Sequence, residues 1–311
     1  MTTSSQLQDQ EQLKLRVKLD PHGRVGVNIG LFTGATFTAG WNNTGVGAGP
    51  RDYHLSVKQL FIDAQPIAGV TGSVGSLYFW RGEATEITTF DNDGYLTGER
   101  LSIKRPREVF FDELSVTRAF IGDVNTPSVF RRSNRLDDAN YWQYGVGKAL
   151  ALGKRAVAMS FEYDVYNHAE IVRGAVRASL PARLTVRLEG YRRVNQIAAG
   201  GVAISGEKAV TKRITLLVGY GTIDPHFGAL NGERYGIGRH LFSTGSLAVS
   251  KELSFGYYIA RGIANDFRVP IGTRVEIIGT YNLLNRLKRL RGQTGQTGQT
   301  VLTGRRTSPG A

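Results

Sequence analysis

The sequence predicts an all-β protein whose fold is an antiparallel, up-and-down transmembrane β-barrel of about 12 to 14 strands. Three observations carry this prediction. Apolar and polar residues alternate along most of residues 25 to 283, very short connections join successive segments, and the segments in the middle of the chain are roughly 10 residues long. Such a segment is longer than a typical soluble strand, and it is long enough to cross a bilayer when tilted.

The clearest alternation runs from residue 156 to residue 194, which reads as three consecutive strands. One face of each strand is apolar and the other polar, because successive side chains of a strand point to opposite sides. Asn167-His168 and Pro181-Ala182 leave room only for hairpin turns, so the strands are expected to be antiparallel neighbours. The polar face carries charges of both signs at strand centres, which is typical of a barrel that is apolar outside and charged inside.

Further strands are expected on both sides of this stretch. They are predicted at residues 25–41, 55–65, 70–80, 110–121, 141–150, 200–205, 210–222, 235–242, 245–263 as one strand or two, and 274–283. Residues 81–108 are interpreted as a polar interruption between strands. The chain is thereby divided into a polar N-terminal segment at 1–20, expected as a mobile end or a short helix, a β-barrel domain at 21–284, and a basic, low-complexity C-terminal tail at 285–311.

Composition limits the classes of protein that remain. No apolar run approaches the ~18 residues that a membrane helix needs, so any crossing of a membrane has to be made by strands. The chain of 311 residues contains no Cys, which excludes disulfides and thiolate metal sites. Because the sequence also shows no P-loop, dinucleotide fingerprint or zinc-ligand spacing, we expect no metal and no cofactor.

The net charge of +13 does not indicate a nucleic-acid partner. Six of the basic residues lie in the C-terminal tail, and the others are spread over alternating strand positions instead of forming a patch beside stacking aromatic rings. A soluble all-β glycan-binding protein is an alternative. It would need a second sheet to cover the apolar faces of the central strands, whereas in a barrel these faces contact lipid; they carry Val157, Phe161, Val176, Val186 and Leu188.

The polar faces of the strands are expected to line the inside of the barrel. Arginines outnumber carboxylates on them, so the potential of an open, wet lumen would favour anions. The alternative is that these charges pair across strands and fill a closed interior, although a barrel of about 12 or more strands is wide enough to hold water. The predicted lumen residues are Glu162, Asp164, Arg173, Arg177, Arg187, Glu189, Arg193, Arg213, Arg274 and Glu276.

The longest stretch without periodicity, residues 122–143, is a candidate constriction loop. Folded into the lumen, its opposed charges would create a transverse field. The alternative is a solvated loop outside the barrel. The candidate constriction residues are Arg131, Arg132, Arg135, Asp137 and Asp138.

A barrel enzyme that acts on lipid or peptide is a further alternative. His168 lies near Glu170 and His226 follows Asp224 closely, so each histidine could be a base oriented by a carboxylate. Neither histidine has a recognisable nucleophile motif near it. We therefore expect a protein that is not an enzyme, with no catalytic residue.

The N-terminus shows no basic region followed by an apolar core, so no secretory signal peptide is visible. For an exported barrel we expect that the signal was removed or that the start is misplaced.

The alternation over residues 25 to 283, the hairpin turns, and the segments VFFDELSVTRAFIGD and NYWQYGVGKAL together resemble the bacterial outer-membrane β-barrel porins as a broad class. The resemblance implies a location in the bacterial outer membrane and a passive pore for small solutes, which the excess of inward arginines predicts to be anionic. It also implies two partners, the lipid bilayer and the barrel-assembly machinery, which reads a final strand ending on an aromatic residue. In this chain a basic tail follows the last predicted strand.

Overall fold

The computed structural model describes residues 12–32, 56–85, 87–89, 96–105, 110–121, 129–153, 155–195, 197, 199–224, 237–264, 273–282 and 300–302. The strand predicted at 25–41 is therefore described only as far as residue 32. Of the predicted tail at 285–311, the described part is residues 300–302.

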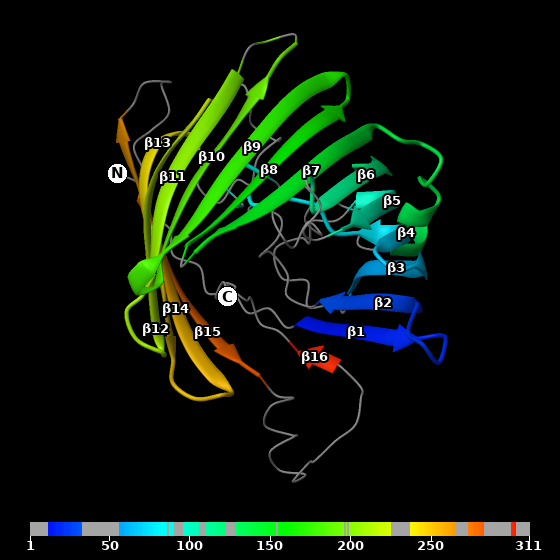
Figure 1. Ribbon diagram of the computed structural model, residues 1–311, viewed down its shortest axis with the longest axis horizontal. Coiled ribbons are helices and arrows are strands. Elements are labelled where there is room, and N and C mark those ends of the chain that lie inside the picture. The colour runs from blue at the N-terminus through cyan, green and yellow to red at the C-terminus, as the bar shows by residue number, and fades with distance from the viewer. Residues whose placement is uncertain are drawn as a thin grey trace.

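The described strands form one sheet in which β1 to β15 pair in the order of the sequence, and the last strand, β16, pairs with β1. Figure 1 shows this sheet curving around an interior that holds coil from the connection between β4 and β5. The elements are β1 (Gln12–Lys18), β2 (Val25–Phe32), β3 (Ser56–Ile67), β4 (Val70–Leu77), β5 (Leu96–Lys104), β6 (Glu113–Phe120), α1 (Val129–Ser133), β7 (Tyr141–Leu152), β8 (Arg155–Tyr166), β9 (Ala169–Leu180), the 3-10 turn η1 (Pro181–Arg183), β10 (Leu184–Arg193), β11 (Ala199–Ala209), β12 (Ile214–Ile223), β13 (Gly238–Ala248), β14 (Leu253–Ala264), β15 (Thr273–Tyr281) and β16 (Thr300–Leu302).

The predicted antiparallel up-and-down arrangement is confirmed, since each strand runs antiparallel to both of its neighbours. Alternate connections therefore lie at opposite ends of the sheet. One end, the turn end, carries short connections such as 68–69 and 210–213, and the other, the loop end, carries the connections 78–95 and 121–140. Strands β15 and β16 are the two edges of the sheet, and within the described residues it is not closed between them.

Within the described residues the sheet contains 16 strands, slightly more than the predicted number of about 12 to 14. Strand β1 lies in the N-terminal segment, for which the sequence predicts a mobile end or a short helix, and β5 lies in the predicted polar interruption. In β1, Leu13, Leu15 and Val17 alternate with basic residues inside a Gln-rich segment. In β5 the adjacent charges of Glu99 and Arg100 fall on both faces, which obscures the alternation. The three-residue strand β16 has no periodic signal to detect.

Both predicted hairpin turns of the central stretch are present. Asn167 and His168 have φ values of 47° and 67°, as a tight two-residue hairpin turn requires, and Asn tolerates this region better than most residues. The second turn is one residue longer than predicted. It includes Arg183, which has a φ of 57°, so that Leu180 pairs with Leu184 across it.

The outer face of the central strands is apolar and exposed. Phe161, Val176 and Leu188 are 51%, 42% and 53% exposed, whereas Glu162 and Asp164 on the other face of β8 are buried. All described strands belong to the single sheet, so within the described residues no second sheet covers this face. The β-sandwich required by the soluble glycan-binding alternative is therefore wrong for this part of the chain.

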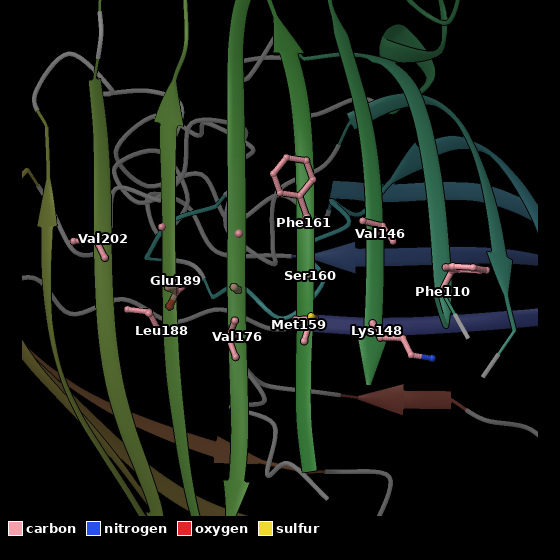
Figure 2. Close-up of a pocket in the computed structure, with 13 residues that line it drawn as sticks. Phe110, Val146, Lys148, Met159, Ser160, Phe161, Val176, Leu188, Glu189 and Val202 are labelled. Atoms are coloured by element: carbon pink, nitrogen blue, oxygen red, sulfur yellow. The ribbon is translucent and has the colours of Figure 1, made fainter. Parts of the chain in front are cut away.

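A shallow hollow of about 590 Å³ marks this outer face across β7 to β11. Figure 2 shows side chains from neighbouring strands around it, among them Val146, Phe161, Val176 and Leu188. The hollow exists because Gly174 and Gly190 leave space between the larger side chains. In the described part of the chain, no helix is long and apolar enough to cross a membrane.

Candidate functional site: the inner wall and the inward segment

The inner face of the sheet brings most of the predicted lumen residues together. The strand register places Glu162 opposite Arg173 and Arg177 opposite Arg187. On this face lie Glu162 and Asp164 from β8, Arg173 and Arg177 from β9, Arg187, Glu189 and Arg193 from β10, and Glu276 from β15.

Two predicted lumen residues are not found in the described wall. Arg213 lies in the exposed turn between β11 and β12, because β12 begins at Ile214 and not at the predicted Val210. The side chain of Arg274, on β15, lies outside the described part of the chain.

One ion pair of the inner wall is completely buried. Arg173 Nη1 lies 2.7 Å from Asp164 Oδ2, and the two side chains are 1% and 0% exposed. Tyr141 donates its hydroxyl hydrogen to the other oxygen of Asp164 at 3.2 Å. Because both charges are paired and hydrogen-bonded without access to solvent, this pair belongs to the structural framework of the wall.

The inward segment, residues 78–85 and 87–89, leaves β4 at the loop end and lies against the inner wall (Figure 1). Its main anchor is the carboxylate of Glu189 on β10. Glu189 accepts hydrogen bonds from the backbone N–H of Thr85 at 2.6 Å, from the Thr85 hydroxyl, and from the Thr88 hydroxyl at 2.7 Å. Hydrogen bonds to an ionised acceptor are stronger than neutral ones, so Glu189 fixes the position of this segment.

Glu83 attaches the inward segment to β8 and β9. Arg177 donates to the Glu83 carboxylate through Nε at 2.5 Å and through Nη2 at 3.4 Å. The backbone N–H of Glu83 donates to Ser160 Oγ at 2.8 Å. The Glu83 and Arg177 side chains are both 24% exposed, so solvent reaches this ion pair.

Trp80 attaches the start of the inward segment to β6 and β7. Its carbonyl accepts from Gln143 Nε2 at 2.9 Å, and its indole N–H donates to Glu113 at 3.0 Å. The ring covers Gly145, where an added Cβ would lie 2.3 Å from the nearest ring carbon. Glycine is therefore the residue that permits this close approach.

Apolar contacts complete the attachment of the inward segment. Phe79 and Ile87 are buried in one cluster with inward-facing residues of the loop end, among them Leu96 and Ile171. The ring of Phe79 meets that of Tyr141 edge to face at a centroid distance of 5.9 Å. The segment is thus packed against the wall as well as hydrogen-bonded to it.

The described part of the predicted constriction loop contacts the outer face of the wall. Arg135 pairs with Asp138 at 2.7 Å, and its guanidinium lies 5.2 Å from the ring of Phe120, on the outer face of β6. Arg118, also on that outer face, donates to the carbonyl of Asp137 at 3.2 Å. The structure thus places Arg135, Asp137 and Asp138 outside the wall, and the side chains of Arg131 and Arg132 lie outside the described part of the chain.

Strand β1 adds a basic stripe to the inner wall that the sequence analysis does not identify. The register with β2 and β3 places Lys14, Arg16 and Lys18 on the inner face. Arg16 pairs with Asp63 at 2.6 Å, and Lys14 Nζ lies 5.0 Å from the ring of Tyr78. The alternation of β1 is itself the signal that could have identified the stripe.

The structure describes one of the two histidines that the sequence offers as bases. His168 occupies the exposed turn between β8 and β9, and His226 lies outside the described residues. The carboxylate of Glu170 accepts from the Tyr163 hydroxyl at 2.8 Å and from Asn195 at 3.2 Å. Among the described residues, no three His, Asp or Glu side chains are grouped so as to hold a metal ion.

Solved structures of porins resemble this chain in fold. A Salmonella typhi OmpF in complex with daunomycin matches with a TM-score of 0.56 and 10% identity, over 90% of this chain and 93% of that chain. A triple mutant of the Rh. blastica porin matches with a TM-score of 0.50 and 11% identity, over 88% and 97%. No protein-family model and no curated protein matches the sequence. The likeness shows that the fold is that of a porin-like β-barrel.

Proposed function

We propose that this protein is a pore of the bacterial outer membrane through which small anionic solutes diffuse passively. The observation that carries the proposal is that one sheet separates an exposed apolar face from a charged inner face. An apolar outer band and a polar interior are what a strand-built wall needs when lipid lies outside and water inside.

The proposed mechanism needs no cofactor. A water-filled lumen lowers the free energy of moving a polar solute across the hydrocarbon layer, because the solute keeps its hydration or exchanges it for wall groups. The inward segment then reduces the bore at the level of Glu83, Thr85 and Thr88, where it is bonded to the wall.

Basic groups on two parts of the wall support the preference for anions. Arg187 and Arg193 face inward from β10, and β1 contributes Lys14, Arg16 and Lys18. Cationic side chains on a low-dielectric wall attract anions and repel cations. The lipid bilayer and the barrel-assembly machinery are the partners of this proposal, with the loop end facing outward because long loops of such barrels lie on the extracellular side.

The test has two stages. In the first, gel mobility of the detergent-extracted protein in SDS is compared with and without boiling. A folded barrel is expected to migrate differently until it is heated, and a soluble protein without this shift would contradict the proposal.

In the second stage, the purified protein is inserted into planar bilayers under a KCl gradient, and the reversal potential reports its ion preference. We expect chloride to permeate better than potassium, and replacing Lys14, Arg16 and Lys18 together by Gln to reduce this preference. Arg118→Gln, which removes an outer-face charge, is the control. If potassium permeates better than chloride through the wild type, the proposed preference for anions is wrong, whereas the proposed pore function stands.

A further inference from the structure

Two arginines lie side by side on the inner wall where the inward segment crosses it. Arg177 on β9 and Arg187 on β10 are directly opposite each other in the strand register. Like charges in such positions repel unless a counter-charge lies between or beside them. Glu83 supplies one counter-charge through its two bonds to Arg177, and Glu207 on β11 interacts electrostatically with both guanidinium groups.

The structure leaves binding capacity at this pair of arginines. Within the described residues, the Nε of Arg187 is buried and has no hydrogen-bond acceptor. Arginine presents its donors in a planar fork that matches the two oxygens of a carboxylate. The guanidinium beside that of Arg177 therefore has one donor, Nε, without a partner among the described residues.

The Glu83–Arg177 pair is accessible, in contrast to the other ion pair on the same wall. Glu83 and Arg177 are each 24% exposed, whereas Arg173 and Asp164 are 1% and 0% exposed. Water therefore reaches Arg177 and Glu83, but not Arg173, and the neighbouring Arg187 is partly exposed. Glu83 also belongs to a connection between strands, whereas Arg177 belongs to the sheet, so we assign the exchange to the side chain of Glu83.

We propose that Arg177 and Arg187 form a binding site for a small carboxylate solute, and that Glu83 occupies this site as a built-in competitor when no solute is bound. This inference rests on the proposed pore function, which it deepens by naming the solute class and the residues that select it. Glu83 indicates the class of ligand, because its carboxylate accepts two hydrogen bonds from Arg177.

Replacement of the Glu83 carboxylate by the carboxylate of a solute keeps the net charge around the two arginines unchanged. With Glu83 in place, the two arginines are balanced by Glu83 and Glu207; when Glu83 leaves, one positive charge is uncompensated until a carboxylate replaces it. The inward segment remains attached by Thr85 and Thr88 to Glu189 during this exchange. Binding of the solute thus loosens the segment only at Glu83.

The experiment measures block of the chloride current through the full-length protein in planar bilayers by added succinate. We expect Glu83→Gln to lower the half-blocking concentration about fivefold, the factor that corresponds to ~1 kcal/mol for a partly exposed ion pair. Arg187→Gln is expected to raise it by a similar factor, and Arg187→Lys to raise it less because the charge is kept. Glu99→Gln, which removes the same charge from the exposed outer face of β5, is the control and is expected to behave as the wild type.

The outcomes separate this inference from the proposed function. Absence of any channel from the wild type overturns the pore itself. If the protein forms channels but the half-blocking concentration of succinate is unchanged in both Glu83→Gln and Arg187→Gln, the proposed pore function stands and the proposed carboxylate site is wrong. Each variant is first checked for the heat-dependent mobility shift, and Glu83→Ala replaces Glu83→Gln if the latter does not fold.

Discussion

The guanidinium of Arg173 and the carboxylate of Asp164 face each other across 2.7 Å on neighbouring strands, and neither side chain touches solvent. Arg173 also donates through Nε to the carbonyl of Thr88 at 3.2 Å. One residue of the wall thus compensates a buried charge and holds the inward segment. A buried ion pair of this kind is costly to break, since removal of one partner leaves an unpaired charge without water.

Arg173→Gln is expected to destabilise the protein by about 3–5 kcal/mol, because it leaves Asp164 without its counter-charge. The measurement is the temperature at which the folded band disappears in an SDS gel. The double variant with Asp164→Asn should recover most of the loss, since both charges are then absent. An unchanged transition temperature in the single variant would contradict a structural role for the pair.

Glu189→Gln is expected to release part of the inward segment and to raise the single-channel conductance. The amide oxygen of Gln accepts hydrogen bonds without a negative charge, whereas bonds to a charged acceptor contribute roughly 1.5–3 kcal/mol. The hydrogen bonds from Thr85 and Thr88 to residue 189 would therefore be weaker. The control is Glu99→Gln on the outer face. A conductance equal to that of the wild type would show that this segment does not restrict the bore.

Gly145→Ala is expected to displace Trp80 and to cost about 1–3 kcal/mol of stability, as overpacking usually does. The added Cβ would lie 2.3 Å from the indole ring. Gly174→Ala is the matched control, because the nearest atom to its Cβ would be the carbonyl oxygen of Ser160 at 3.8 Å. Denaturant unfolding of both variants tests this prediction, which fails if the two lose the same amount. Trp80→Ala combined with Gly145→Ala should remove the overpacking.

Val176→Arg is expected to cost about 2–4 kcal/mol in a bilayer, since it places a charge near the middle of β9 on the exposed apolar face, which the proposed function assigns to lipid. Ser246→Arg places the same side chain on the inner face of β13, opposite Thr215, where water is expected. The measurement is the free energy of unfolding from lipid vesicles. If Ser246→Arg costs as much as Val176→Arg, the assignment of the two faces is wrong.

The sequence predicts which side of the wall a residue faces better than it predicts what that residue contacts. Alternation is a local property with a period of two, so the inward positions of Glu162, Arg173 and Glu189 follow from the strands alone. Strand ends are less certain, because a polar turn and a polar strand end look alike. Arg213 shows this, since the predicted strand begins four positions before β12.

The choice of the segment that enters the interior could not be predicted from the sequence. Thr85 and Glu189 are separated by 104 positions, and no local pattern reports a contact over that distance. The inward segment carries the same residue types as a solvated loop. The segment around Arg135 has the more conspicuous charges, but Arg135 pairs with Asp138 three positions away and lies over Phe120 on the outer face of β6.

The same separation in sequence has a consequence for the order of assembly. From β7 to β12 every connection is short, so each hairpin can form from residues that are close in the chain, at little cost in loop-closure entropy. The bonds from Thr85 and Thr88 to Glu189 close a loop of more than 100 residues. We therefore expect the strands to pair before the inward segment binds to the wall. A newly folded protein should then show a higher conductance for a short time, until Thr85 and Thr88 form their hydrogen bonds to Glu189.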